Sequence, residues 1–428
     1  MVERTVAPRV LAILLIVSAV AYMDRQILAI LIEPIKHELG LSDTQAGLLY
    51  GFTFAAFFAL LGVPIAKRTN RTNRSRIIVR SLVLFSTMTV LCGTTVAYWQ
   101  LLAARVGVGI GEAGTNPASQ SMIADLYPVD RRSGAMAIFA TGPHVGILLG
   151  FAVGGLLGSW LGWRQAFVVA GGLSLAVAVL VRMSLREPAQ ASVGNAPAVS
   201  VTSVAAVLWR HASIRHIVAG AAIANMGTAA LTGWLASFLV RSHGFSIGAA
   251  GTLLALFVGV FGGVGVVIGG RLADRMGARA ARWRLQIPAI GILMCVPCWA
   301  IVFADSGAPA TLVALAVGAG LIQFHVGPTF AMVQSAVPPA MRPLAAALLL
   351  LVVSFVGFGL GPLVVGRLSD LLAATYGADS LRVSLRIVPL LFAWAACHYY
   401  AAARALGPGL DAVGDIMRNL DSRGTRGD

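Results

Sequence analysis

The sequence predicts an all-α integral membrane protein with twelve transmembrane helices in two pseudo-symmetric six-helix bundles. The first observation is composition, because 58% of the 428 residues are hydrophobic and only 11% are charged. Soluble proteins carry about 25% charged residues. The second observation is a series of apolar runs of about 20 residues, the length that crosses a bilayer as a helix. The third is that motifs of the first half recur in the second half.

Twelve apolar runs meet the length requirement for a membrane span. Helices are expected in all of them, because lipid offers no hydrogen-bond partner to free backbone groups. The expected spans lie near residues 10–36, 44–66, 77–97, 99–124, 133–160, 164–183, 214–240, 246–270, 284–304, 309–336, 343–369 and 385–405.

The basic residues are distributed unevenly between the two sides that these spans define. If the N-terminus is cytoplasmic, Lys67 and most arginines fall inside, chiefly within 67–76, 131–132, 182–186 and 271–284. The expected outer side holds only Lys36, Arg164, Arg241, Arg367, Arg382 and Arg386. This asymmetry orients membrane proteins. It predicts a multi-pass protein of the inner (plasma) membrane with both termini in the cytoplasm, and it explains the net charge of +15 without nucleic-acid binding.

A polar stretch, "LREPAQASVGNAPAVSVTS" at 185–203, separates the sixth and seventh spans. We therefore expect an N-terminal bundle at 1–184, a cytoplasmic linker at 185–212, a C-terminal bundle at 213–406 and a cytoplasmic tail at 407–428. We expect the protein to act as a monomer.

The two halves share three motifs at similar positions. "AKRTNRTN" at 66–73 corresponds to "GRLADRMG" at 270–277, and "GVGIGEAGTNP" at 107–117 to "GAGLIQFHVGP" at 318–328. "GP" recurs at 142–143 and 361–362. Duplicated six-helix halves are typical of a large class of secondary transporters.

These motifs make the chain resemble the major facilitator superfamily over about residues 8–406. The loop motif is carried by 270–277, the fourth-helix motif by Arg105 with Gly109 and Gly111, and the fifth-helix antiporter motif by Gly142-Pro143 with the glycines that follow. The resemblance implies the major facilitator fold and alternating access. It also implies gating roles for Asn70 and Arg71 in the first loop motif and for Asp274 and Arg275 in the second.

Within that superfamily the chain is similar to the spinster branch. The similarity is carried by "YMDRQILAI" at 22–30, "GVPIAK" at 62–67, residues 105–128 and "DRRSGAMAIF" at 130–139. It implies transport of an amphipathic anionic lipid, such as a lysophospholipid or sphingosine-1-phosphate, with proton coupling.

The first loop motif departs from the family, because Asn70 stands where the family has an acidic residue. The resemblance implies that this acid latches the cytoplasmic side in outward-open states. We therefore expect Asn70 to favour inward-open states, and Asn70→Asp to favour outward-open ones.

Four ionisable residues, Asp24, Arg25, Arg105 and Glu112, fall near the middle of the first and fourth spans. A charge at the bilayer centre costs about 2.5–3.5 kcal/mol even on the lenient insertion scale. These side chains must therefore face one another or a wet cavity. The second half has no such charges, since Glu112 aligns with Gln323 and Arg105 with Ala316. A purely structural pair of ion pairs remains the alternative to a functional site.

The chemistry of these side chains suggests their roles. Burial raises the pKa of a carboxyl group and a nearby arginine lowers it. A cavity that opens and closes changes both effects, so Glu112 or Asp24 can take up a proton on one side and release it on the other. The arginine fork suits phosphate and carboxylate. Arg25 is the first candidate for an anionic headgroup, and Arg105 is the alternative or the partner of Glu112.

Weaker candidates for the substrate cavity are Asn116, Gln323 and His325, for which hydrogen bonding between helices is the alternative role. Glu33 and Asp43, near the outer rim, are expected to be solvated. "RVGVGIGEAG" at 105–114 has the Gly109-x-Gly111-x-x-Gly114 spacing of a dinucleotide loop, but it lacks the strand–loop–helix context that such a loop requires. We expect its glycines to pack helices.

No cofactor, metal site or enzymatic activity is expected. Neither lysine, Lys36 or Lys67, ends a phosphate-binding loop, which argues against an ATP-driven pump. Three functions remain open: a proton-coupled lipid transporter, a proton-coupled exporter of other small amphipathic or anionic molecules such as drugs or aromatic acids, and a sensor or scaffold without transport. The buried charges disfavour the last. The expected partners are a small-molecule or lipid substrate, protons and membrane lipids.

Overall fold

The structure is a computed structural model in which the segments 3–53, 55–57, 73–127, 129–185, 187, 200–304, 307–338 and 341–406 are described. These segments are almost entirely helical, and they contain no strand. The all-α prediction is therefore confirmed.

Contacts between the helices group the chain into two compact units, which are described separately. The first unit comprises Met1–Ala196, Ala229–Val260 and Phe358–Leu385. The second unit comprises Pro197–Thr228, Phe261–Gly357 and Arg386–Asp428. The first unit thus contains parts of the chain from both predicted halves. The boundaries expected at residues 184 and 213 stay a prediction.

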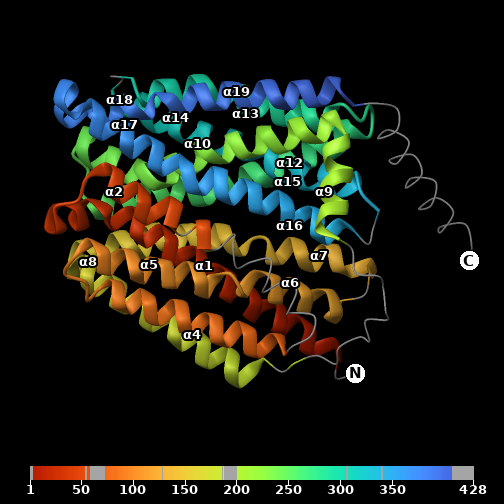
Figure 1. Ribbon diagram of the computed structural model, residues 1–428, viewed down its shortest axis with the longest axis horizontal. Coiled ribbons are helices and arrows are strands. Elements are labelled where there is room, and N and C mark those ends of the chain that lie inside the picture. The colour runs from red at the N-terminus through yellow and green to blue at the C-terminus, as the bar shows by residue number, and fades with distance from the viewer. Residues whose placement is uncertain are drawn as a thin grey trace, which may run out of the picture. The chain divides into compact units, whose positions relative to one another are not determined.

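The first unit is built around long helices that lie side by side, with α1, α4, α5 and α8 alongside one another (Figure 1). Its helices are α1 (Glu3–Leu39), α2 (Asp43–Gly47), η1 (Leu48–Phe52), α4 (Arg74–Cys92), α5 (Tyr98–Glu112), α6 (Thr115–Leu126), α7 (Val129–Phe139), α8 (Gly142–Ser184), α11 (Ile247–Leu254), α17 (Gly361–Tyr376), η6 (Gly377–Asp379) and α18 (Ser380–Leu385).

In the second unit α13 packs against both α14 and α19. Its helices are α9 (Val201–Arg210), α12 (Gly262–Gly277), α13 (Trp283–Val302), α14 (Ala308–Leu321), η3 (Ile322–His325), α15 (Val326–Ser335), α16 (Arg342–Val352) and α19 (Ile387–Arg404). Three further helices contribute residues to both units, namely α10 (Ala212–His243), η2 (Ala255–Phe261) and η5 (Val353–Leu360).

Within the described segments, eight helices are long and apolar enough to cross a membrane by length and composition. Two of these continuous helical runs each cover two predicted spans, namely Gly134–Ser184 and Leu344–Arg404. The chain turns from one span to the next at Gly162 (φ 80°) in the first run and at Gly377 (φ 53°) in the second. The fourth predicted span is divided into α5 and α6, and residues 54 and 58–66 of the second span lie outside the described residues. The eight helices are thus compatible with the predicted twelve spans.

A row of glycines on α8 places α1. A Cβ atom at Gly146 would lie 2.3 Å from the Ala19 carbonyl oxygen, and one at Gly150 would lie 2.6 Å from the Met23 carbonyl oxygen. Gly142 and Gly154 make similar approaches to α1. Small residues at four-residue spacing let two helix backbones approach closely in a membrane. This contact fixes the stretch of α1 that carries Asp24 and Arg25.

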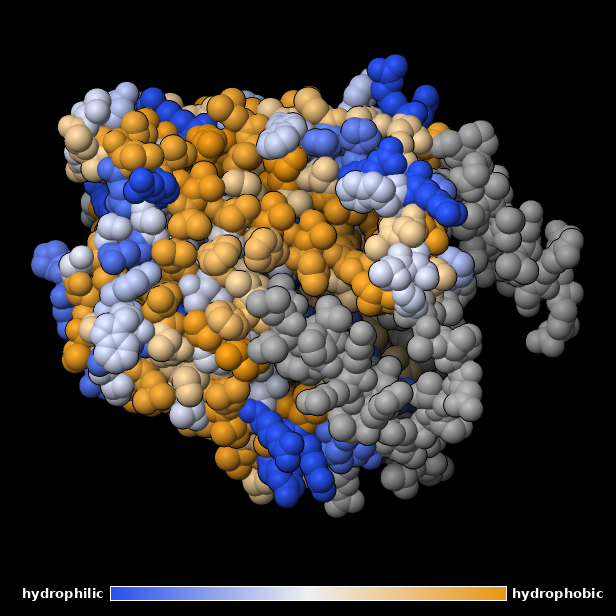
Figure 2. Space-filling view, viewed as in Figure 1, coloured by the Kyte–Doolittle hydropathy of each residue, from blue (hydrophilic) through white to orange (hydrophobic). Residues whose placement is uncertain are grey.

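Apolar side chains are also abundant on the exterior. Figure 2 shows hydrophobic residues over much of the visible face, with hydrophilic side chains gathered toward its margins. Exposed large residues such as Leu173, Val179, Leu293 and Leu390 contribute to this exterior. An exterior rich in exposed apolar side chains fits lipid as the surrounding solvent.

Candidate transport site

Two ion pairs join α1 to α5 inside the first unit. Arg25 donates to Glu112 Oε2 from Nε (2.9 Å) and from Nη2 (2.6 Å). Arg105 Nη1 donates to Asp24 Oδ2 at 2.9 Å. The Thr89 hydroxyl on α4 donates to the other Asp24 oxygen at 2.6 Å. The four charges predicted to face one another therefore do so, in two separate pairs.

The expectation that Arg105 could be the partner of Glu112 is wrong. The two residues are seven positions apart, and about 10 Å separates them along the helix axis. Asp24 and Arg25, adjacent on α1, instead bind Arg105 and Glu112 respectively. Each pair therefore connects two helices.

The two pairs differ in their access to solvent. The Asp24 and Arg105 side chains are each 1% exposed, whereas Arg25 is 12% exposed and its partner Glu112 is 0% exposed. Glu112 Oε1 is buried and has no hydrogen-bond partner within the described segments. Of the two pairs, Arg25 with Glu112 is thus the one that a ligand can reach.

Arg25 and Asn116 line one small pocket between α1, α6 and α7. Tyr22 lies beside them, with its ring centroid 4.5 Å from the Arg25 guanidinium carbon. Ser18 and Ser119 add hydroxyl groups to the pocket wall. The structure therefore brings together Arg25 and Asn116, which were predicted separately. The pocket that they line offers a ligand a cation, an aromatic ring and hydrogen-bonding groups.

The helix that carries Glu112 is interrupted directly after it. α5 ends at Glu112 and α6 begins at Thr115. The Thr115 hydroxyl donates to the Glu112 carbonyl oxygen at 2.9 Å, which satisfies an acceptor left free by the break. Interrupted helices of this kind form substrate and ion sites in many transporters.

The second unit contains the other predicted pair, Gln323 and His325. Both belong to η3, a 3₁₀ segment that interrupts the tenth span. In the alignment of the two halves, this interruption corresponds to the break between α5 and α6. His325 is buried, with Nδ1 2.6 Å from the Ile322 carbonyl oxygen and Nε2 3.5 Å from Asn225 Nδ2. Gln323 is half-buried and lies against Gly262.

A further polar cluster, the Asp43 cluster, was not predicted. It consists of Glu33, Lys36, Asp43, Arg241 and Asp370. Arg241 donates to Glu33 (2.7 and 2.8 Å) and to Asp43 (2.8 and 2.9 Å), and Lys36 pairs with Asp43. Asp370 accepts hydrogen bonds from the backbone N–H groups of Asp43 and Thr44, at the start of α2.

The expectation that Asp43 is solvated is therefore wrong, whereas Glu33 is half-buried and paired with Arg241. Asp43 is buried, because α17 covers it and the Ser369 hydroxyl donates to it at 2.6 Å. Burial on its own raises the pKa of the Asp43 carboxyl. Hydrogen bonds and positive charge from Arg241, with Lys36, outweigh that effect and hold the pKa well below its ordinary value.

The loop-motif residues can be located only in part. Asp274 and Arg275 lie near the end of α12, at exposed positions. Asn70 and Arg71 lie outside the described residues, so the expected effect of Asn70 stays a prediction.

Sequence reasoning missed several polar residues around these sites. Tyr22, Thr89 and Arg241 are in or beside predicted spans, and each contacts a charged side chain. In the second unit, Asn225 and Tyr399 flank His325. The signal that could have found Asn225 and Arg241 is their polarity within or at the end of the apolar seventh span.

The glycine-rich stretch of α5 packs helices as predicted. A Cβ atom at Gly111 would lie 2.7 Å from the Phe85 backbone nitrogen on α4, and one at Gly107 would lie 2.6 Å from the Met88 side chain.

Helical spans, interrupted helices and buried charges facing a pocket together define a multi-pass membrane transporter. The sequence profile of the Major Facilitator Superfamily matches residues 14–396, so the chain belongs to this superfamily.

Comparisons with individual proteins agree with this assignment. The chain is 34% identical over 397 residues to an MFS-type efflux pump of Mycolicibacterium smegmatis, covering 92% of each chain. It is 28% identical over 390 residues to protein spinster homolog 3 of Danio rerio, covering 85% of this chain and 76% of the relative.

Among solved structures, the chain is similar to a bacterial homologue of the human lysosomal transporter spinster in an inward-facing, unoccupied conformation. The TM-score is 0.84 at 27% identity, covering 93% of this chain and 97% of the other. The twelve-helix fold and the resemblance to the spinster branch are therefore confirmed.

Proposed function

We propose that the protein moves an amphipathic anionic molecule across the inner membrane by alternating access, with protons as the coupling ion and with both termini in the cytoplasm. The observation that carries this proposal is the Arg25–Glu112 pair at the edge of a pocket with polar groups. An anionic substrate competes with Glu112 for Arg25. Release of Glu112 from its only charged hydrogen-bond partner within the described segments favours its protonation.

The remaining candidates take supporting roles in this proposal. Arg25 and Asn116 bind the headgroup, and Glu112 carries the proton. Asp24 and Arg105 respond to the same event through the second pair, with Asp24 as the alternative proton site and Arg105 as the alternative anion site. Gln323 and His325 contribute polar contacts from the second half, while Asn70, Arg71, Asp274 and Arg275 control opening at the cytoplasmic side. A single chain is the functional unit.

Two substrate classes are supported by different relatives. Similarity to spinster proteins favours the class that the sequence resemblance implies, a lysophospholipid or a sphingosine-1-phosphate-like lipid. The higher identity to the mycobacterial efflux pump supports export of other small amphipathic or anionic organic molecules.

A substrate panel in proteoliposomes tests the proposal and distinguishes the two classes. The panel contains lysophospholipids, sphingosine-1-phosphate, amphipathic drugs and aromatic acids, each measured with and without a pH gradient. We expect uptake or release of at least one anionic amphiphile to depend on the pH gradient. Flux of none of these compounds above that of protein-free liposomes would contradict the proposal.

A further inference from the structure

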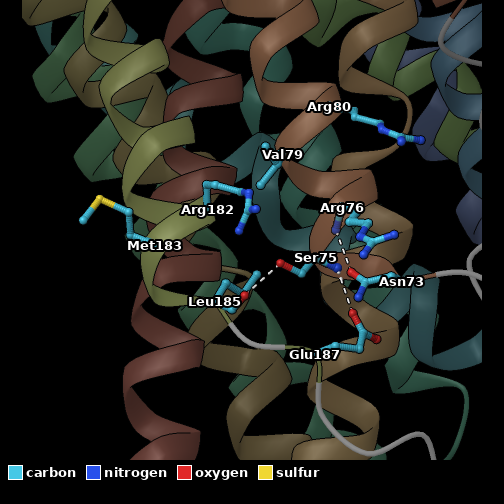
Figure 3. A pocket seen from close by; sticks show the side chains of 9 residues that line it. All are labelled: Asn73, Ser75, Arg76, Val79, Arg80, Arg182, Met183, Leu185 and Glu187. Carbon is cyan, nitrogen blue, oxygen red and sulfur yellow. Dashed lines mark hydrogen bonds between the residues drawn. The ribbon is translucent and has the colours of Figure 1, made fainter.

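A cavity of about 550 Å³ lies between the start of α4 and the end of α8, in the first unit (Figure 3). It is separate from the pocket at Arg25. Its lining includes Asn73, Arg76 and Arg80 from the α4 side, and Arg182, Met183 and Glu187 from the α8 side. The two helices pack against each other along their length, so the cavity is part of a built interface.

The cavity has an excess of positive charge. Arg76 and Arg80 are one helical turn apart and extend to the same side of α4 in this view, away from Arg182, whose side chain extends from α8 toward α4 (Figure 3). No carboxylate of the described residues forms an ion pair with any of these three arginines. All three side chains belong to exposed residues.

The acid that lines the cavity is already engaged. Glu187 Oε1 accepts a hydrogen bond from Arg74 Nε at 2.7 Å, and Oε2 accepts one from the Ser75 backbone N–H at 2.9 Å. Arg74 is 2% exposed and also pairs with Asp125. Glu187 therefore neutralises the buried Arg74, and the charge of the three lining arginines remains available to a ligand.

Apolar side chains continue from the cavity along both helices. Met183, which lines the cavity, is 79% exposed, and Val179 and Leu180 are exposed on the preceding turn of α8. Val83 and Leu84 are exposed on α4, one turn beyond Arg80. The arginines that line the cavity are therefore adjacent, along both helices, to exposed apolar side chains.

We propose that this cavity binds the headgroup of an anionic phospholipid, with its acyl chains along the exposed apolar side chains of α4 and α8. Guanidinium groups suit phosphate oxygens. Basic pockets between membrane helices bind acidic headgroups, and anionic lipids attract basic segments most strongly on the cytoplasmic side. The arginine excess also places this end of the helices at the cytoplasmic surface. A freely diffusing phosphate would use the arginines but would leave the apolar surface unused.

Thermal unfolding of the purified protein in detergent tests the proposal. The probes are dioleoylphosphatidylglycerol, dioleoylphosphatidylcholine and inorganic phosphate, titrated separately at constant ionic strength. A ligand that binds the folded state raises the unfolding midpoint. We expect phosphatidylglycerol to raise the midpoint of the wild type, and the other two probes to leave it nearly unchanged.

The matched variants carry three substitutions each. Arg76→Gln/Arg80→Gln/Arg182→Gln removes the lining arginines, and Arg210→Gln/Arg279→Gln/Arg282→Gln removes three exposed arginines of the second unit. If each arginine contributes about fivefold to the apparent affinity for phosphatidylglycerol, the first variant loses roughly 100-fold in that affinity. The second keeps the wild-type response. An unchanged response of the first variant, or an equal midpoint shift with inorganic phosphate, would overturn the proposal.

A labelling measurement covers the case in which the triple variant does not fold. A fluorophore on Met183→Cys, in a Cys298→Ser/Cys397→Ser background, is exposed to phosphatidylglycerol or phosphatidylcholine with brominated acyl chains. We expect stronger quenching by phosphatidylglycerol. A control label on Leu173→Cys, about 15 Å along α8, is quenched equally by both lipids. Equal quenching at position 183 would refute a headgroup-selective site.

Discussion

At the scale of single residues, the two buried ion pairs differ in how directly a ligand can reach them. The Asp24–Arg105 pair is closed off from solvent, and the Thr89 hydroxyl holds it in place. The Arg25–Glu112 pair borders a pocket, and Glu112 Oε1 has no hydrogen-bond partner among the described residues. The first pair fits a role in joining α1 to α5, and the second fits a role in binding.

Arg105→Gln should lower the stability of the fold. The substitution leaves Asp24 buried without its cation, which costs about 3–5 kcal/mol. The double variant Asp24→Asn/Arg105→Gln should recover part of that loss, because it removes both charges. Unfolding in detergent by heat or denaturant measures the difference. A double variant less stable than Arg105→Gln would argue against this account.

Arg25 should discriminate anionic from neutral ligands. Arg25→Gln should weaken binding of an anionic substrate by at least about tenfold, since a charged hydrogen bond contributes about 1.5–3 kcal/mol. Binding of an uncharged analogue should change much less. Arg25→Lys keeps the charge without the fork and should give an intermediate result. Equilibrium binding of both ligands to all three proteins is the measurement, and equal losses for both ligands would contradict the assignment.

The positions of these charges could be predicted from the sequence, but their pairing could not. Ionisable residues in apolar runs are recognisable because charge in a bilayer is costly. Which arginine meets which carboxylate depends on how α1 and α5 are rotated and on their relative height. These are set by packing, such as the approach of α8 glycines to α1, that no local pattern specifies.

At the scale of elements, the glycine row of α8 controls the placement of α1. Gly146→Ala should destabilise the protein by about 1–3 kcal/mol, since its Cβ would overlap the Ala19 carbonyl and force the helices apart. Gly172→Ala, on the same helix with open space around it, is the matched control. It should be neutral or slightly stabilising. Unfolding curves that do not distinguish the two variants would argue against close α1–α8 packing.

Most helices could be predicted from length and hydropathy, whereas the interruptions could not. The fourth and tenth spans were expected to be continuous, yet they break at Ala113–Gly114 and at Ile322–His325. Glycine is common in membrane helices without breaking them, so its presence alone does not locate a break. Both breaks lie at candidate site residues.

At the scale of the whole molecule, the Asp43 cluster should stabilise the closed state of the protein at the side where the C-terminal end of α1 lies. Arg241→Gln removes its hydrogen bonds to Glu33 and Asp43 and should shift the conformational equilibrium at least about tenfold toward opening at that end. Alkylation of Ala46→Cys, in α2, by a membrane-impermeant maleimide reports the opening.

Arg164→Gln is the matched control for this experiment. It breaks the Glu38–Arg164 ion pair, which joins two helices of the same predicted half. It should leave the alkylation of Ala46→Cys unchanged. Equal alkylation rates in the two variants would contradict a latch at Arg241.

The Asp43 carboxyl should not titrate between pH 5 and 8. A carboxyl group whose pKa is lowered by folding stabilises the folded state at any pH above its ordinary pKa of about 3.9. This stabilisation is lost only as the pH falls to the lowered pKa of the folded state. Arg241 and Lys36 lower the pKa of Asp43, so it stays ionised throughout this range. Alkylation of Ala46→Cys in the Asp43→Asn background should therefore be faster than in the parent, by a factor that does not change with pH. A factor that disappears toward pH 5 would contradict the assignment.

The proposed transport depends above all on Glu112, which couples proton movement to substrate movement. The most direct test compares wild type and Glu112→Gln in proteoliposomes, with a substrate identified from the panel. Two modes are measured: flux driven by a pH gradient, and exchange of labelled for unlabelled substrate at equal pH. We predict that Glu112→Gln abolishes gradient-driven accumulation and retains exchange. Accumulation at the wild-type level in Glu112→Gln would contradict the account.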